Sequence, residues 1–446
     1  MFLDGVTYVL SSLFISICKR VPYSFLKFLG HFFGLCIFYL VPKYRKTALT
    51  NLALAFPNKS YKERYSIARQ SVQHTVITIL ELLAVESLTP HLDDLITIDT
   101  AEKSPQGFSQ DELMTQEELL TTFTQLDNKE GLILFCGHQA NWELPFLFIT
   151  RNYPGLAFAK PINNIKLNRK IIKLRESFKG RIVSPKGGVR HALRALNEGW
   201  IIGIVGDQSL LTSSYTYPLF GSDAFTTTSP GLLAYKTGKP VVSVSISRHN
   251  KGYKIALSNK FYADRSLPIK EASSKLMDNV MHFLEKGIAA QPEQWMWMHK
   301  RWKRKLVNKF KKRYAYSHIL VLVKETNLSS LETFLQDLSV FYSGATLDLA
   351  VQTLQTSYSL PEAYSNYNLK VFSNLNELYD MPNSYPAVFD LINLPRSLRK
   401  HYKKTGSVAL FTQKTLEKKC LTDKPLISSL KSFSRQHTKI NTENCN

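Results

Sequence analysis

Cysteine is scarce in this chain, and its placement excludes two kinds of structure. The 446 residues contain five cysteines, at positions 18, 36, 136, 420 and 445. Their number is odd, they are dispersed, and none forms a C-x-x-C pair. This pattern fits a reducing compartment and argues against a disulfide framework or a zinc site.

Acidic residues are also few relative to basic ones. Lys and Arg together number 57 against 35 for Asp and Glu, which gives a formal net charge of +22. Such an excess indicates an anionic partner, which can be nucleic acid, an anionic membrane, a phosphorylated lipid or an acidic protein. The hydrophobic fraction of 44% argues against disorder, and the length allows two or three domains.

No apolar run reaches the length of a straight transmembrane helix. Residues 5–18 and 28–41 are apolar, each for about 14 residues, whereas a helix needs roughly 20 to cross a bilayer. We expect two helices embedded in or lying on a membrane, with basic residues at the headgroups. These are Lys19, Arg20, Lys43, Arg45 and Lys46. Two buried helices of a soluble core, or one spanning helix over 25–41, are the alternatives.

Strand and helix patterns alternate from residue 61 to about residue 291. An amphipathic helix over 61–84 comes first, and short apolar segments then alternate with segments of helical spacing. This order predicts an α/β fold with a central mixed sheet flanked by helices, whose functional groups gather at strand ends. The expected strands are 95–98, 131–136, 156–159, 181–184, 200–205, 240–247 and 253–257, and 218–221 is expected to be a loop.

The segment Gly131–Glu143 carries the clearest chemistry. Residues 131–136 read as a buried strand, His138 follows directly, and Glu143 comes five positions later. A carboxylate that holds one imidazole nitrogen leaves the other free to take a proton from a hydroxyl. Residues five apart on one helix do not face each other, so the pair requires His138 to lie in the turn before the helix. The spacing alone also fits a histidine satisfied by local hydrogen bonds.

Other polar groups follow neighbouring predicted strands. Asp207, at the end of the strand 200–205, can bind substrate, position a base or cap the next segment. Lys186 with Gly187 and Gly188 opens a helix and is suited to anions, although the motif is too short for a Walker loop.

Residues 292–313 combine aromatic and basic side chains. From Lys300 to Arg313, nine of fourteen residues are basic and none is acidic, and Trp295, Trp297, Trp302 and Phe310 add aromatics. This combination suits membrane headgroups, a phosphorylated lipid or single-stranded nucleic acid, and a solvated linker is the plain alternative.

The character of the chain changes at Tyr314. Five short apolar segments, 318–323, 345–351, 369–372, 387–392 and 408–411, read as strands separated by helical stretches. We therefore expect four parts: a membrane-associated helical segment (1–60), a main domain (61–312), a small α/β domain (314–420) and a polar tail (421–446). The small domain has no Gly-rich phosphate loop, nucleophile elbow or metal-spaced ligands.

Several stretches taken together resemble one family, the late acyltransferases of lipid A biosynthesis, which are relatives of the glycerol-phosphate acyltransferases. The order and spacing agree from about residue 1 to residue 312. The matching pieces are residues 44–57 (YRKTALTNLALAFP), 137–143 (GHQANWE), 206–208 (GDQ), 218–221 (PLFG) with 226–228 (TTT), and 292–301 (PEQWMWMHKR).

The resemblance implies an enzyme on the cytoplasmic face of the inner membrane, held there peripherally or by a single pass. It would transfer a fatty acyl chain from acyl carrier protein to a hydroxyl of a lipid A precursor. His138 would be the general base paired with Glu143. The substrate-binding positions would be Lys160, Asn164, Arg175, Asp207, Gln208 and Arg301. Hydroxyl acylation requires no metal or other cofactor.

The sequence departs from the family pattern at several places. Lys160 stands where an arginine before a proline is expected, and Asp207-Gln208 replaces Asp-His-Asp. Residues 101–130 are longer than expected, and 314–446 have no counterpart. The partners implied are the carrier protein, the lipid precursor and an anionic membrane, with no nucleic acid. A phospholipid or glycolipid acyltransferase with another acceptor is the first alternative, and a non-enzymatic basic membrane- or nucleic-acid-binding protein is the second.

Overall fold

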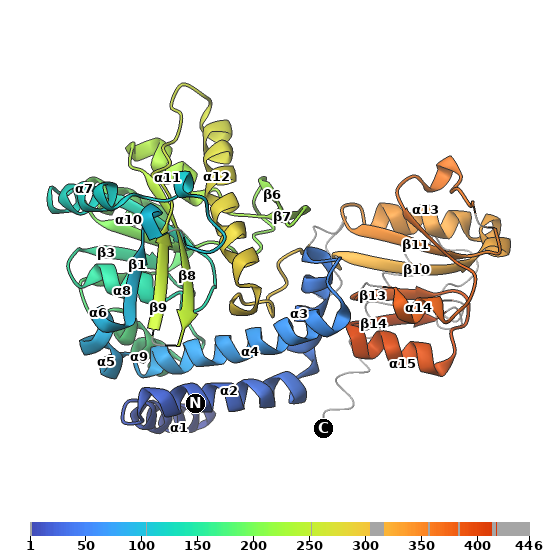
Figure 1. Ribbon diagram of the computed structural model, residues 1–446, viewed down its shortest axis with the longest axis horizontal. Helices are drawn as coiled ribbons and strands as arrows, with labels where there is room; N and C mark the ends of the chain where they lie inside the picture. The colour runs from blue at the N-terminus through green and yellow to red at the C-terminus, as the bar shows by residue number, and fades with distance from the viewer. Residues whose placement is uncertain are drawn as a thin grey trace. The chain divides into compact units, whose positions relative to one another are not determined.

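The structure is a computed structural model that describes residues 2–103, 105–250, 252–303, 316–355, 357–381, 384–412 and 416. The chain divides into two compact units (Figure 1). Unit 1 comprises Met1–Val41 and Ser66–Arg301, and unit 2 comprises Pro42–Tyr65 and Trp302–Asn446. The basic stretch 304–315 and the predicted tail 421–446 lie outside the described residues.

Unit 1 contains a seven-stranded mixed sheet, as the alternating pattern predicts. The strand order is β1-β9-β8-β2-β5-β3-β4, and every pair is parallel except β8 with β9. The mixed character arises because β8 and β9 form a hairpin, whereas the other neighbours are joined through helices. The strands are β1 (Ile96–Asp99), β2 (Leu132–Cys136), β3 (Gly155–Phe158), β4 (Gly180–Val183), β5 (Ile201–Val205), β8 (Val241–His249) and β9 (Gly252–Leu257).

Helices cover both faces of this sheet. Alternation along β8 separates the faces: the Ser243 hydroxyl donates to the Val280 carbonyl of α12, whereas Val242 and Val244 point toward α7 and α8. The helices of the first face are α10 (Pro185–Asn197), α11 (Ser229–Thr237) and α12 (Ile269–Ala290), and those of the second include α7 (Gln116–Asp127) and α8 (Leu144–Thr150). The helix α9 (Ile165–Arg175) packs near β4.

A short hairpin in unit 1 differs from the sequence expectation of a loop over 218–221. Strands β6 (Thr216–Leu219) and β7 (Ser222–Phe225) pair antiparallel around Phe220 and Gly221. Both turn residues have positive φ, +50° and +73°, which is the geometry of a type I′ hairpin turn. A phenylalanine at such a position is uncommon, so the residue pattern did not indicate a hairpin.

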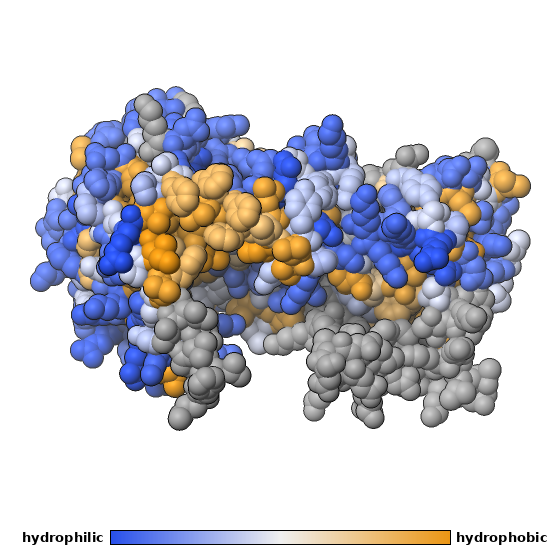
Figure 2. Space-filling view, turned by 90° about the horizontal axis from the view of Figure 1, so that it is seen from below, coloured by the Kyte–Doolittle hydropathy of each residue, from blue (hydrophilic) through white to orange (hydrophobic). Residues whose placement is uncertain are grey.

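The N-terminal helices expose an apolar surface (Figure 2). Helices α1 (Phe2–Cys18) and α2 (Tyr23–Leu40) are longer than the two apolar runs, and α2 continues through His31. Among the described helices, α2 has the length and composition to cross a membrane by itself, and only 22% of it is buried. Exposed apolar side chains of this surface include Leu13, Ile17, Phe25, Phe28, Phe32, Phe33 and Leu40.

Helix α2 packs closely on α4 (Tyr61–Leu83). A Cβ added at Gly30 would lie 2.4 Å from Ile77, and one at Gly34 would lie 2.5 Å from the Cα of Gln73. Glycine at these two positions lets the helix backbones approach, so α2 presents one face to α4 and leaves the opposite face exposed.

Unit 2 contains a five-stranded sheet in which all strands are parallel, in the order β12-β11-β10-β13-β14. Its strands coincide with the five apolar segments of the sequence: β10 (His318–Lys324), β11 (Thr346–Gln352), β12 (Asn368–Phe372), β13 (Ala387–Asp390) and β14 (Ala409–Thr412). Two apolar cores pack on the sheet, one containing Val321 and the other Leu320 and Leu322. The unit also contains α3 (Pro42–Ala55), α13 (Glu332–Phe341), α14 (Glu377–Asp380) and α15 (Arg396–Thr405).

Candidate active site

Strand register brings His138 and Asp207 together. The neighbouring parallel strands β2 and β5 pair Cys136 with Val205. His138 and Asp207 each lie two residues beyond these partners, so they emerge side by side at the carboxyl edge of the sheet. Gly137 and Gly206 intervene, and a Cβ on Gly137 would lie 3.0 Å from the Asp207 carboxylate. Glycine at position 137 therefore allows the close approach.

The His138 ring is fixed by Asp207. Nδ1 of His138 lies 2.6 Å from Oδ1 of Asp207, and the His138 backbone N–H donates to Oδ2 at 2.8 Å. Because an ionised carboxylate only accepts hydrogen bonds, Nδ1 carries the proton and Nε2 presents its lone pair. Nε2 lies 3.2 Å from the side-chain amide nitrogen of Gln208. The geometry is that of a histidine prepared to accept a proton at Nε2.

Asp207 remains ionised although it is buried. Asp207 is 3% exposed, and burial by itself raises the pKa of a carboxyl group. The electrostatic attraction of the adjacent His138 ring, the two hydrogen bonds from His138 and the Trp295 indole N–H, which donates at 2.6 Å, together outweigh burial. The net effect holds the pKa of Asp207 well below its usual range.

Glu143 does not pair with His138 in this structure, which corrects the sequence expectation. The side chain of Arg175 holds both carboxylate oxygens of Glu143, with Nε donating to Oε2 at 3.0 Å and Nη2 donating to Oε1 at 2.6 Å. His138 does lie outside the helix, as the spacing required, because α8 begins at Leu144. That condition did not determine the partner, since Asp207 occupies the position at Nδ1.

A large pocket opens at His138. It encloses about 570 Å³, and its lining includes His138, Glu143 and Arg175 together with many apolar side chains. The apolar residues come from α4, the turn before α8, α8, α9 and the sheet, and they include Leu82, Trp142, Phe146, Phe158 and Ile171. The pocket therefore joins a polar end at His138 to a long apolar wall.

Cys136 lines the same pocket but is not suited to be a nucleophile. Burial, reinforced by the charges of Asp207 and Glu143, raises the pKa of its thiol. A thiol without thiolate character is unreactive.

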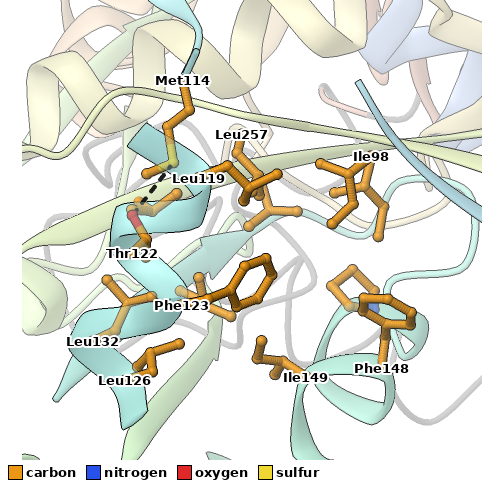
Figure 3. A pocket seen from close by; sticks show the side chains of 15 residues that line it. Ile98, Met114, Leu119, Thr122, Phe123, Leu126, Leu132, Phe148, Ile149 and Leu257 are labelled. Atoms are coloured by element: carbon orange, nitrogen blue, oxygen red, sulfur yellow. Dashed lines mark hydrogen bonds between the residues drawn. The ribbon is translucent and has the colours of Figure 1, made fainter. Parts of the chain in front are cut away.

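A smaller apolar cavity lies next to this pocket (Figure 3). It encloses about 50 Å³ between α7, α8 and the sheet. Leu134, Pro145 and Val244 line both spaces and so form the wall between them. The long segment 101–130 supplies Met114, Leu119, Thr122, Phe123 and Leu126 to this cavity.

The other predicted substrate-binding residues fall into two groups. Lys160 is exposed and lines the pocket, as does Gln208. Asn164 caps α9 by accepting a hydrogen bond from the Leu167 backbone N–H at 3.1 Å, and it is not part of the lining. Arg301 is 1% exposed and donates to the Phe225 carbonyl and the Thr226 hydroxyl. Arg301 therefore stabilises the segment after β7 and does not face this pocket.

The tryptophans of the segment 292–303 are buried, which corrects the expectation of headgroup contact. Trp295, Trp297 and Trp302 are 3%, 0% and 1% exposed. The backbone of Trp295 forms a bridge with Gln139, and its indole N–H reaches Asp207. Trp295 is thus a site residue that the sequence interpretation missed, although the PEQWMW motif contained it.

The fold and the site define an α/β protein with a buried carboxylate–histidine pair at the carboxyl edge of its sheet, an arrangement typical of general base catalysis. Residues 4–304 match a family model described as bacterial lipid A biosynthesis acyltransferase, and the chain therefore belongs to this family. Membership indicates acyl transfer in lipid A biosynthesis, with an acyl donor and a lipid acceptor. No curated protein in the comparison matches the chain.

Proposed function

We propose that this protein transfers a fatty acyl chain from acyl carrier protein to a hydroxyl group of a lipid A precursor, with His138 as the general base. The observation that carries the proposal is the His138 ring, whose Nδ1 lies 2.6 Å from Asp207 and which lines a pocket with many apolar side chains. The family match indicates the reaction class, and the contact between His138 and Asp207 supports the assignment of His138 as the base.

The chemical step follows from the two ring nitrogens. Nε2 of His138 takes the proton of the acceptor hydroxyl while its oxygen attacks the thioester carbonyl carbon. Asp207 stabilises the imidazolium that forms, because its carboxylate holds Nδ1–H. The carbon–sulfur bond then breaks, and the departing thiolate takes the proton from Nε2. The new ester and the free carrier thiol account for every atom.

Substrate binding uses the two ends of the pocket. The fatty acyl chain lies along the apolar wall formed by residues such as Phe146, Phe158 and Ile171. Exposed Lys160 at the rim contacts a phosphate of the lipid precursor. Arg175 is held by Glu143, so we assign this pair to shaping the pocket, where it separates the apolar wall from the reacting groups.

Membrane association uses the apolar surface of α1 and α2. Phe25, Phe28, Phe32 and Leu40 are exposed on α2, and apolar area of this kind partitions into a bilayer interface. The net charge of +22 favours anionic lipid and an acidic carrier protein. The proposed location is the cytoplasmic face of the inner membrane, where the lipid precursor resides.

The decisive experiment compares the purified full chain with His138→Ala in detergent or vesicles, using acyl carrier protein loaded with a labelled fatty acid. We expect one new acyl group on the lipid A precursor, detected by mass spectrometry, and its loss in the variant. Acylation of a glycerol phosphate lipid in place of lipid A would reassign the acceptor. Equal product with His138→Ala would overturn the mechanism.

A further inference from the structure

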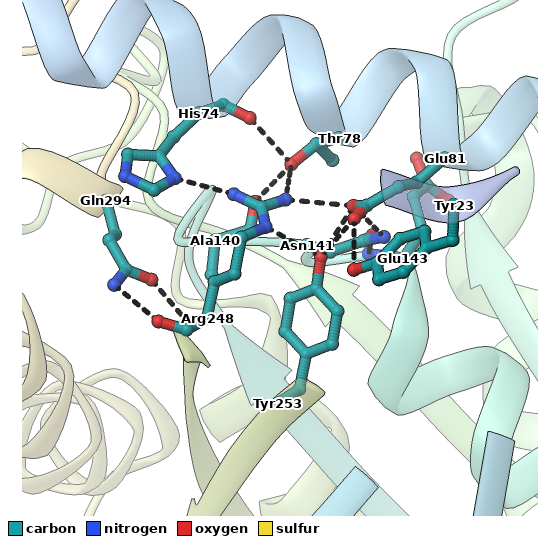
Figure 4. Close-up of polar contacts among 10 residues, drawn as sticks. All are labelled: Tyr23, His74, Thr78, Glu81, Ala140, Asn141, Glu143, Arg248, Tyr253 and Gln294. Carbon is teal, nitrogen blue, oxygen red and sulfur yellow. Dashed lines mark hydrogen bonds and ion pairs between the residues drawn. The ribbon is translucent and has the colours of Figure 1, made fainter. Parts of the chain in front are cut away.

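A buried ion pair lies next to Ala140 and Asn141, two residues of the 138–143 turn (Figure 4). Glu81 on α4 and Arg248 on β8 are joined at 2.8 Å, with side chains 0% and 6% exposed. The Tyr253 hydroxyl on β9 donates to the same carboxylate at 2.6 Å, and Tyr23 on α2 donates at 2.9 Å. Burial of two charges is favourable only when hydrogen bonds satisfy both groups, and these contacts satisfy them.

Two polar side chains, Asn141 and Thr78, connect the ion pair to the 138–143 turn. Asn141 donates to Glu81 at 2.9 Å and accepts the backbone N–H of Glu143 at 3.2 Å. Thr78 accepts from Arg248 at 3.1 Å and donates to the Ala140 carbonyl at 2.5 Å. Each charged partner therefore reaches the turn through one polar side chain.

Gln294 adds a third connection. Its amide binds both backbone groups of Arg248, accepting from N–H at 2.6 Å and donating to the carbonyl at 3.0 Å. The backbone carbonyl of Gln294 accepts a hydrogen bond from the Ala140 N–H at 2.7 Å. The PEQWMW segment is thus held between β8 and the turn.

Ala140 requires such support. Its φ is +45°, in the left-handed region that a residue with a Cβ rarely adopts. A backbone of this kind persists only where its surroundings hold it. Both the N–H and the carbonyl of Ala140 are bound by the cluster just described.

We propose that Glu81 and Arg248 are positioning residues for acyl transfer: they hold the 138–143 turn in the conformation that directs Nε2 of His138 into the pocket. Neither side chain lines that pocket, so they act through Ala140 and Asn141 and do not contact substrate. This inference rests on the proposed function. A displacement of the turn by about 1 Å would lower the rate about 100-fold without weakening substrate binding to the same degree.

Stability and positioning can be separated by removing the charges together. In Glu81→Gln, the buried Arg248 loses its ionic partner, and we expect a lower melting temperature and a kcat at least about 10-fold lower. The double variant Glu81→Leu with Arg248→Met leaves no unpaired charge, so its melting temperature recovers relative to Glu81→Gln. Its kcat stays low, because Asn141 has lost its contact with Glu81 and Thr78 its contact with Arg248, while KM for both substrates changes less than kcat.

The matched control is Glu112→Gln, which breaks another ion pair of unit 1, with Lys286. It lowers the melting temperature and leaves kcat unchanged. A double variant with wild-type kcat would overturn the positioning role and leave the proposed function intact. If the wild-type protein itself transferred no acyl chain to the lipid precursor, the proposed function would be overturned instead.

Hydrogen exchange tests positioning without any activity measurement. We expect the peptide covering 138–143 to exchange faster in the double variant than in Glu112→Gln at matched stability. Equal protection in the two proteins would overturn the inference.

Discussion

At the scale of single residues, the two carboxylates near His138 differ in what they contact. Asp207 is buried and binds the histidine through a ring nitrogen and a backbone N–H, whereas both oxygens of Glu143 belong to Arg175. The carboxylate that contacts His138 and the carboxylate that contacts Arg175 are therefore distinct.

Replacing Asp207 tests this distinction. Asp207→Asn places an amide at Nδ1 and no longer stabilises an imidazolium, so we expect kcat to fall about 10²- to 10⁴-fold. Glu143→Gln releases Arg175 and should change KM more than kcat. Steady-state kinetics with both substrates varied provide the measurement. A larger loss of kcat in Glu143→Gln than in Asp207→Asn would instead support Glu143 as the partner of His138, as the sequence spacing predicted.

His74 makes stability depend on pH. Burial, and then the charge of Arg248, lower the pKa of His74 from 6.5 to about 3, and its Nδ1 accepts from Arg248 at 2.7 Å. Below pH 6.5 the unfolded chain binds a proton that the folded chain does not bind until about pH 3, so stability falls as pH falls through this window. The loss from His74 reaches about 2 kcal/mol at pH 5.

The variant His74→Asn keeps an acceptor toward Arg248 but does not titrate. Urea unfolding at pH 7.5 and pH 5 should therefore show a smaller loss of stability in this variant than in the wild type. An identical pH dependence in both proteins would contradict the assignment to His74.

At the scale of elements, the pattern of apolar residues located most of the strands but did not indicate the β6–β7 hairpin. Strands β2 and β5 are continuous apolar runs because parallel strands are covered on both faces. The β6–β7 hairpin has no such run, and its turn contains Phe220 at positive φ. Helix α7 begins at Gln116, because Thr115 and Glu118 form a capping box there.

The exposed apolar face of α2 is expected to contribute to membrane binding. Phe28→Ser with Phe32→Ser removes two exposed aromatic side chains of 60% and 52% exposure. Each is expected to weaken binding to vesicles about 10-fold, given ~1.5–3 kcal/mol for burial of a phenylalanine side chain. Co-sedimentation with anionic vesicles measures this. Leu120→Ser, an exposed leucine on α7, is the control and should bind as the wild type does.

At the scale of the whole molecule, the residues matched by the family model do not coincide with either compact unit. The family model covers residues 4–304, and the five-stranded parallel sheet of unit 2 follows it in the chain. Each unit has its own apolar core. Separate cores predict separate unfolding transitions.

Val321 provides the test, because it is fully buried in the core of unit 2. Val321→Asp buries a charge without a partner, so we expect one calorimetric transition to move down or disappear while the other is unchanged. Acyl transfer at a temperature below both transitions should stay at the wild-type rate. A single cooperative transition, lowered as a whole, would show that the units unfold together.

The sequence alone determined the local features of this protein. Apolar runs placed the strands and the exposed N-terminal helices, and His138 was located directly after the strand 131–136. Only the tertiary structure decided which carboxylate meets that histidine. Asp207 is 69 positions away in the chain, and it reaches His138 because β5 lies beside β2 in parallel register. Spacing along a sequence describes neighbours within one helix or strand, whereas strand order in a sheet is set by packing across the whole domain.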